Sequence, residues 1–126
     1  MQFQELIARA AGIRTQYEAL EQHRYGRTWT DEEVMLGFLG DVGDLAKLVQ
    51  AKAGVRDIPE LEAKLAHELA DCLWSVFVLA RYYNVDLEQA FLHTMNEIEH
   101  SINQHSETNT ITASRNETYG AGNAAN

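Results

Sequence analysis

Apolar residues recur at every third or fourth position along most of this chain, a spacing that predicts amphipathic helices. The first helix is expected over about 2–23. A polar connection follows, and Thr30 is expected to cap a second helix, because Glu33 three residues later completes a capping box. This second helix should end near Gly54, since glycine readily adopts the left-handed conformation that closes a helix.

Two further helices are expected after a short link. Pro59 suits the first turn of the third helix, which continues to about Asn84 and is apolar on more than one face. A helix of this kind is central to a fold or buried between subunits. Asp86, with Gln89 three residues on, predicts the start of a fourth helix. The inward stripe of that helix comprises Leu87, Phe91, Met95, Ile98 and Ile102.

Four helices joined by short links predict an all-α fold, a four-helix antiparallel bundle. From about residue 106 the composition shifts to Asn, Thr, Ser, Gly and Ala without periodicity. We therefore expect one helical domain over 1–105 and a flexible or partner-bound tail over 106–126. The third helix carries more apolar surface than one small bundle can cover, which predicts a homo-oligomer, by default a dimer, with a tetramer as the alternative.

Composition and charge narrow the classes of partner. The 126 residues are 45% hydrophobic and 23% charged, as in soluble globular domains. A net charge of −9 argues against DNA, RNA or an anionic membrane surface as partner. Cys72 is the only cysteine, so an internal disulfide is excluded and a reducing compartment is favoured. Without a signal peptide or an apolar run of about 20 residues, the expected location is the cytoplasm.

Two pairs of acidic residues carry the candidate chemistry. Asp41 and Asp44 fall in the second predicted helix, and Glu68 and Asp71 fall in the third. A spacing of three places both members of a pair on one helix face, and the short link makes the two helices antiparallel neighbours. Four carboxylates gathered away from water require a cation. Oxygen ligands alone favour Mg²⁺, with Mn²⁺ as the alternative.

One acidic pair on a helix is usually only a solvated surface, whereas two pairs in apolar helices that face each other favour a metal site. Three glycines lie within the second predicted helix, at a spacing of three and beside the acids: Gly37, Gly40 and Gly43. Each costs about 1 kcal/mol relative to alanine inside a helix. We therefore expect a steric reason for them, either close approach of the helix backbones or room for a ligand.

These motifs resemble those of the MazG family of all-α nucleoside triphosphate pyrophosphohydrolases. The resemblance rests on Gly-Asp-Val-Gly-Asp-Leu-Ala-Lys at 40–47, Glu-Leu-Ala-Asp at 68–71 and Val-Asp-Leu at 85–87. It extends over about residues 25–102 and is nearest to the MazG-like and dCTP pyrophosphatase branches. It implies a helical bundle of the MazG type, working as a dimer or tetramer.

The resemblance also implies the reaction and the site. Members hydrolyse a (deoxy)nucleoside triphosphate to the monophosphate and pyrophosphate with Mg²⁺. The four implied metal ligands, of which the second pair is also assigned as catalytic, are Asp41, Asp44, Glu68 and Asp71. In related enzymes aromatic residues before the metal helix lie against the base, which implies this role for Tyr25 and Trp29. For Trp29 a packing role at the start of the helix is the alternative.

The chain departs from the family pattern in two ways. Asp replaces Glu at positions 41 and 44, which sets each carboxylate one methylene further from the ion. The basic residues that members often carry on the fourth helix are absent, so Lys47 and Lys52 are expected to contact phosphate, with Arg27 and Arg81 as further sources of positive charge. Two other functions stay open: a nucleotide- and metal-binding protein with weak or no hydrolase activity, and a purely structural helical oligomer.

Overall fold

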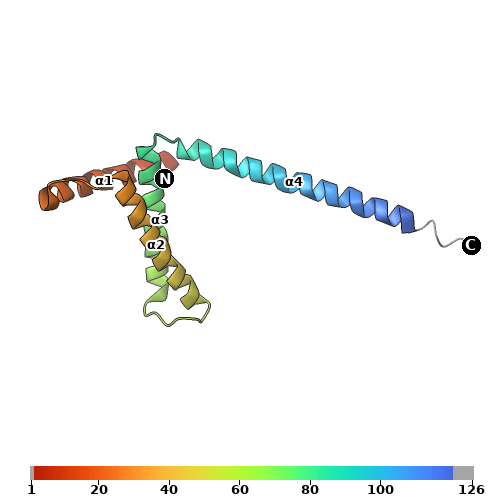
Figure 1. Ribbon diagram of the computed structural model, residues 1–126, viewed down its shortest axis with the longest axis horizontal. Coiled ribbons are helices and arrows are strands. Elements are labelled where there is room, and N and C mark those ends of the chain that lie inside the picture. The colour runs from red at the N-terminus through yellow and green to blue at the C-terminus, as the bar shows by residue number, and fades with distance from the viewer. Residues whose placement is uncertain (1, 121–126) are drawn as a thin grey trace, which may run out of the picture. The chain divides into compact units, whose positions relative to one another are not determined.

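The computed structural model describes residues 2–120, with side chains up to residue 115, and all of its regular elements are helices. Contacts divide the chain into one unit up to residue 87 and a second from residue 88 onward. The all-α prediction is confirmed for this part of the chain. Its four helices are α1 (Phe3–Tyr25), α2 (Asp31–Lys52), α3 (Leu61–Tyr82) and α4 (Leu87–Gly120) (Figure 1).

Both ends of α2 follow the sequence-based expectation. The Glu33 backbone N–H donates to the Thr30 hydroxyl (3.2 Å), and the Glu33 carboxylate accepts from the Thr30 N–H, so the capping box is formed. At the other end Gly54 has a φ of +82°, and the N–H of Val55 donates to the carbonyl of Gln50 at 3.0 Å. Together these features close α2 with a Schellman motif.

The start of α3 differs from the prediction. Pro59 lies in the turn before the helix rather than in its first turn, and Glu60, with a φ of +55°, is the cap residue. The end of α3 repeats the arrangement at the end of α2, with Asn84 at a φ of +54° in place of glycine. The N–H of Val85 donates to the carbonyl of Ala80 at 2.9 Å. Asparagine is the non-glycine residue best suited to this conformation.

In the first unit α2 lies antiparallel beside α3, as the short link predicted, and α1 packs against α3 (Figure 1). Phe3 and Phe77 meet edge to face, with ring centroids 5.4 Å apart. The indole N–H of Trp74 donates to the carbonyl of Ala10 at 3.2 Å. The buried apolar residues come from all three helices: Ala10, Val34, Leu48, Ala51, Phe77 and Val78.

A buried polar network adds to this apolar packing. Arg14 of α1 is 4% exposed; its guanidinium donates to the carboxylate of Glu21 and, through Nε, to the hydroxyl of Tyr82 on α3 (2.8 Å). The same Glu21 carboxylate accepts from the backbone N–H of Trp29 at 3.1 Å. The network therefore ties α1, α3 and the connection into α2 to one another.

The helix of the second unit is longer than the sequence pattern indicated. It continues past residue 106 to Gly120, and the hydroxyls of Thr108, Thr110 and Thr112 each donate to the carbonyl four residues earlier. These bonds satisfy the threonine hydroxyls within the helix itself, at exposed positions. The separation of a tail at residue 106 stays a prediction, and residues 121–126 of it lie outside the described residues.

Four of the five residues of the expected stripe of α4, Phe91, Met95, Ile98 and Ile102, are exposed, and Leu87 is half-buried. The place of α4 as the fourth helix of an antiparallel bundle therefore also stays a prediction. Among residues 2–120 no helix combines the length and the apolar character needed to cross a membrane.

Candidate metal centre

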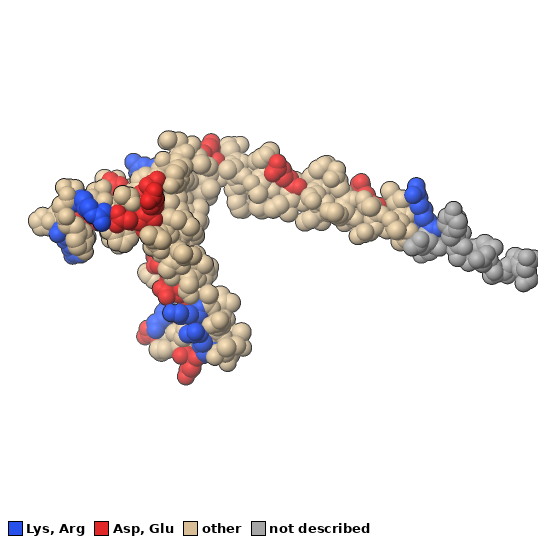
Figure 2. Space-filling view, in the orientation of Figure 1, with Lys and Arg blue, Asp and Glu red and all other residues tan. Residues whose placement is uncertain are grey.

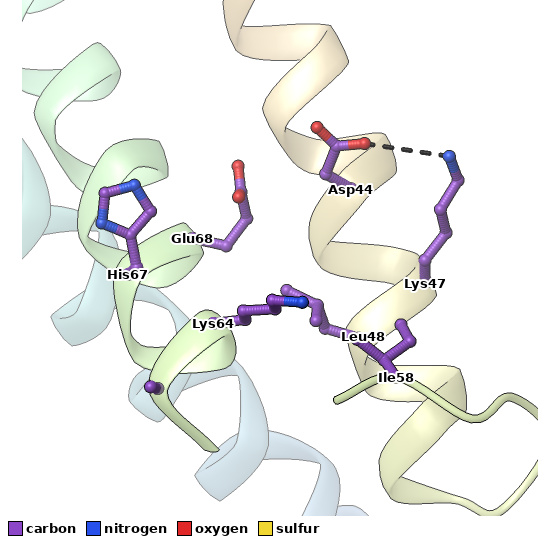
Figure 3. A pocket seen from close by; sticks show the side chains of 8 residues that line it. Asp44, Lys47, Leu48, Ile58, Lys64, His67 and Glu68 are labelled. Carbon is purple, nitrogen blue, oxygen red and sulfur yellow. Dashed lines mark ion pairs between the residues drawn. The ribbon is translucent and has the colours of Figure 1, made fainter. Parts of the chain in front are cut away.

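Three of the four predicted carboxylate ligands come together between α2 and α3. Asp41, Asp44 and Glu68 each offer one oxygen, and these three oxygens lie within 4.8 Å of one another. Figure 3 shows Asp44 and Glu68 pointing toward each other from the two helices. The spacing of three along α2 and the antiparallel packing of α2 on α3 produce this convergence.

Glu68 is the least favourably solvated member of this group. Its Oε1 is buried and has no hydrogen-bond partner among the described residues. Burial raises the pKa of Glu68, and the negative charges of Asp41, Asp71 and Asp44 raise it further. A divalent cation bound here would give this oxygen a partner and would offset the surrounding negative charge.

Asp71, the fourth predicted ligand, lies next to this group but is not part of it. Its Oδ2 is 3.1 Å from Nε2 of His67, one turn earlier on α3. Its charge still reaches Glu68 and the neighbouring Cys72, whose pKa is raised by burial first and then by the surrounding carboxylates. The Cys72 thiol therefore stays protonated and is a poor nucleophile.

A large cavity of about 680 Å³ opens beside the carboxylates, between α1, α2 and α3. Asp41 and Asp71 line it on the acidic side. Tyr25 and Trp29, the two residues expected to contact a base, line it as well. The aromatic residues Tyr17 and Trp74 also line the cavity, and neither was assigned to the site from the sequence. The signal for Trp74 was its position three residues after Asp71, on the same helix face.

A second cavity of about 380 Å³ borders the carboxylates of Asp44 and Glu68 (Figure 3). It is lined by Asp44 and Glu68 and by three basic side chains, those of Lys47, Lys64 and His67. Lys47 was expected near phosphate, and its Nζ lies 3.8 Å from Oδ1 of Asp44. Lys64 was missed, although its position four residues before Glu68 places it on the same face of α3.

The other basic residues considered from the sequence lie elsewhere. Lys52 forms an ion pair with Glu62 and lines neither cavity. Arg27 forms an ion pair with Glu33, and Arg81 donates to the carbonyl of Ala11 at 3.4 Å. Figure 2 shows basic side chains gathered at the loop end of the α2–α3 pair, where acidic side chains are interspersed with them.

The glycines of α2 do not serve a close approach of helices within this chain. A Cβ added at Gly40 or Gly43 would meet nothing within 4 Å, and one added at Gly37 would lie 3.5 Å from Cζ3 of Trp29, an ordinary contact. The expectation of close backbone approach is therefore wrong for the described residues. Room for a ligand stays a prediction: Gly37 lines the larger cavity, whereas Gly40 and Gly43 line neither cavity.

Comparison with known families gives one match. The model of the MazG nucleotide pyrophosphohydrolase domain matches residues 29–105, which include both acidic pairs. Comparisons with curated proteins and with solved structures give no match. The family match covers more than half of the chain and agrees with the motifs at 40–47 and 68–71. This chain therefore belongs to the MazG nucleotide pyrophosphohydrolase family.

Proposed function

We propose that this protein hydrolyses a (deoxy)nucleoside triphosphate to the monophosphate and pyrophosphate in a Mg²⁺-dependent reaction. The observation that carries the proposal is the buried, unpartnered Oε1 of Glu68 inside a group of three converging carboxylates. In a chain of the MazG family, such a group is suited to hold the divalent ion that the reaction needs.

Asp41, Asp44 and Glu68 would hold the ion, and Asp71 would join them on release from His67. Their oxygen donors match Mg²⁺, with Mn²⁺ as the alternative. A bound ion of this kind supplies positive charge to phosphate oxygens and acidifies an attacking water. We assign Glu68 and Asp71 as the catalytic pair because they lie on α3, beside both cavities and next to the site where the α-phosphorus would lie.

The larger cavity suits the nucleoside. Trp29 and Tyr25 are 44% and 66% exposed, and both line this cavity together with Asp41 and Asp71. Stacking of a base on an aromatic side chain is worth about 1–3 kcal/mol. Glu21 holds the backbone of Trp29 in place through its hydrogen bond. We infer that Trp29 and Tyr25 bind the base.

We also propose that the chain assembles as a homodimer in the cytoplasm, with a tetramer as the alternative. The support is the exposure of large apolar side chains on α2 and α3: Leu36, Leu39, Leu69 and Leu73 are between 49% and 68% exposed. Exposed apolar side chains in this number on a small domain are commonly covered by another subunit. Sedimentation velocity would test the assembly, and a monomer at micromolar concentration would contradict it.

The experiment that tests the activity is incubation of the purified protein with Mg²⁺ and each common nucleoside triphosphate, with pyrophosphate release as the readout. Release that is lost in Glu68→Gln supports the proposal. Absence of release with every substrate contradicts it.

A second candidate function is nucleotide and metal binding without turnover. It is motivated by four residues that stand where family members often carry basic residues: Thr94, Ile98, Glu99 and His100. Calorimetric nucleotide binding without hydrolysis would favour it.

A further inference from the structure

We propose that the smaller cavity binds the pyrophosphate end of the substrate and the pyrophosphate product, with Lys64 as its main cationic contact. This inference rests on the proposed triphosphate hydrolysis, because it assigns the two ends of that substrate to the two cavities. Neither the family match nor the acidic motif includes Lys64 in the site.

The position of the carboxylates between the cavities is the first argument. Asp41 and Asp71 line the larger cavity, whereas Asp44 and Glu68 line the smaller one. An ion held by Asp41, Asp44 and Glu68 therefore borders both. A triphosphate bound at that point, with its nucleoside in the larger cavity, extends its β- and γ-phosphates toward the smaller cavity.

The side chains of the smaller cavity are the second argument. Its wall carries the ammonium groups of Lys47 and Lys64 and the imidazole of His67, and its lining includes no Phe, Tyr or Trp side chain. The apolar part of the lining comes from Leu48 and Ile58. Two fixed positive charges beside a metal site suit a compact polyanion better than a nucleoside. The volume of about 380 Å³ is within the range of small-ligand sites.

Lys64 differs from Lys47 and Lys52 in the contacts that its ammonium group makes. Among the described side chains Lys64 forms no ion pair, whereas Lys52 is paired with Glu62 and Lys47 lies near Asp44. Figure 3 shows the Lys64 side chain reaching from α3 toward Leu48 of α2, across the cavity. An ammonium group without a carboxylate partner is available to a phosphate at no cost of breaking an existing pair.

The assignment accounts for the departure of α4 from the family pattern. Positive charge for the β- and γ-phosphates comes from α2 and α3 instead, from residues within one or two turns of the acidic pairs. The leaving pyrophosphate is then held by the same two helices that hold the metal ligands.

Calorimetry with Mg²⁺ and inorganic pyrophosphate as the probe tests this assignment on the full chain. Lys64→Gln should weaken pyrophosphate binding about tenfold, the effect of one lost charge-assisted contact. Lys64→Arg should keep most of the affinity. The matched control is Arg56→Gln, which removes the same charge from an exposed residue outside both cavities and should leave the affinity unchanged. Binding of a deoxynucleoside monophosphate should be the same in all four proteins.

The outcomes separate this inference from the proposed function. Hydrolysis in the wild-type protein together with unchanged pyrophosphate affinity in Lys64→Gln would overturn the inference and leave the function standing. An equal loss in Arg56→Gln would also overturn it, because the effect would then be one of net charge. Pyrophosphate binding that depends on Lys64 in a protein without turnover would support the cavity assignment and contradict the hydrolase. Absence of pyrophosphate binding in the wild-type protein would overturn the inference.

Discussion

The guanidinium group of Arg14 donates two hydrogen bonds to the carboxylate of Glu21, at 2.8 and 3.1 Å, from two turns earlier on the same helix. Both side chains are less than one-tenth exposed. The pKa of Arg14 is raised because the bonds to Glu21 and Tyr82 outweigh the opposing effect of burial. Arg14 therefore keeps its positive charge, which the Glu21 carboxylate balances, in the wall of the larger cavity.

Replacing Glu21 by alanine is expected to destabilise the protein strongly. The change leaves the Arg14 charge buried without its carboxylate, at a cost of about 3–5 kcal/mol. Chemical denaturation would measure the loss of unfolding free energy. Glu18→Ala is the matched control, because Glu18 is on the same helix, 3.5 Å from Arg14, but 39% exposed, so about 1 kcal/mol or less is expected. Equal losses in the two variants would contradict the importance of the buried pair.

Glu68→Gln is expected to stabilise the metal-free protein at neutral pH. A raised pKa in the folded state means that the contribution of Glu68 is favourable below its ordinary pKa and is lost as the pH rises through the raised value. At pH 7 the amide therefore removes an unfavourable charge, and we expect a gain of roughly 1 kcal/mol, or a few degrees in Tm. Differential scanning calorimetry in chelator would measure it.

The same variant gives a test of metal binding. Mg²⁺ should raise the Tm of the wild-type protein and should leave that of Glu68→Gln nearly unchanged, because the variant lacks one of three ligands. Glu62→Gln, an exposed carboxylate on α3, is the control and should keep the response to Mg²⁺. A wild-type Tm that does not respond to either Mg²⁺ or Mn²⁺ would contradict the metal site.

Loss of the cap of α2 is expected to weaken the helix that carries two of the acids. Thr30→Ala removes the acceptor for the Glu33 N–H and should cost about 1 kcal/mol. Thr28→Ala removes a nearby hydroxyl that takes no part in the cap and should be nearly neutral.

The hydrogen bond from Arg27 lowers the pKa of Glu33. The contribution of Glu33 to stability is therefore present above its ordinary pKa and is lost as the pH falls. Thermal unfolding between pH 3 and 7 would record this loss.

Alanine at Gly40 and at Gly43 is expected to raise stability by about 0.5–1 kcal/mol each, because the added methyl group meets open space and alanine favours the helix. Gly26→Ala should have the opposite sign, since Gly26 has a φ of +69°. A loss of stability at Gly40 or Gly43 would mean that another surface, such as a second subunit, covers these positions in solution.

Local sequence patterns predicted much of the fold and part of the candidate site. Three features depend only on residues within one or two turns, and the sequence predicted each of them. They are the capping box at Thr30 and Glu33, the closure of α2 at Gly54 and the shared face of Asp41 and Asp44. The pairing of Asp71 with His67 competes with metal coordination, and the sequence alone could not show which interaction is formed.

Other features depend on contacts between distant segments or on helix preferences that apolar periodicity does not reveal. Lys64 lines the smaller cavity because α2 and α3 enclose a space at that level. In the part of α4 beyond residue 106, threonine hydroxyls bond to the backbone of their own helix. A search for apolar stripes does not detect such a helix, so apolar periodicity did not predict helix beyond about residue 106.

The presence of two cavities beside the carboxylates has a consequence for the order of product release in the proposed reaction. The two cavities share no lining residue. If each half of a cleaved triphosphate occupies its own cavity, each would also leave from its own cavity. Neither product would then block the departure of the other, and release would follow a random rather than a compulsory order.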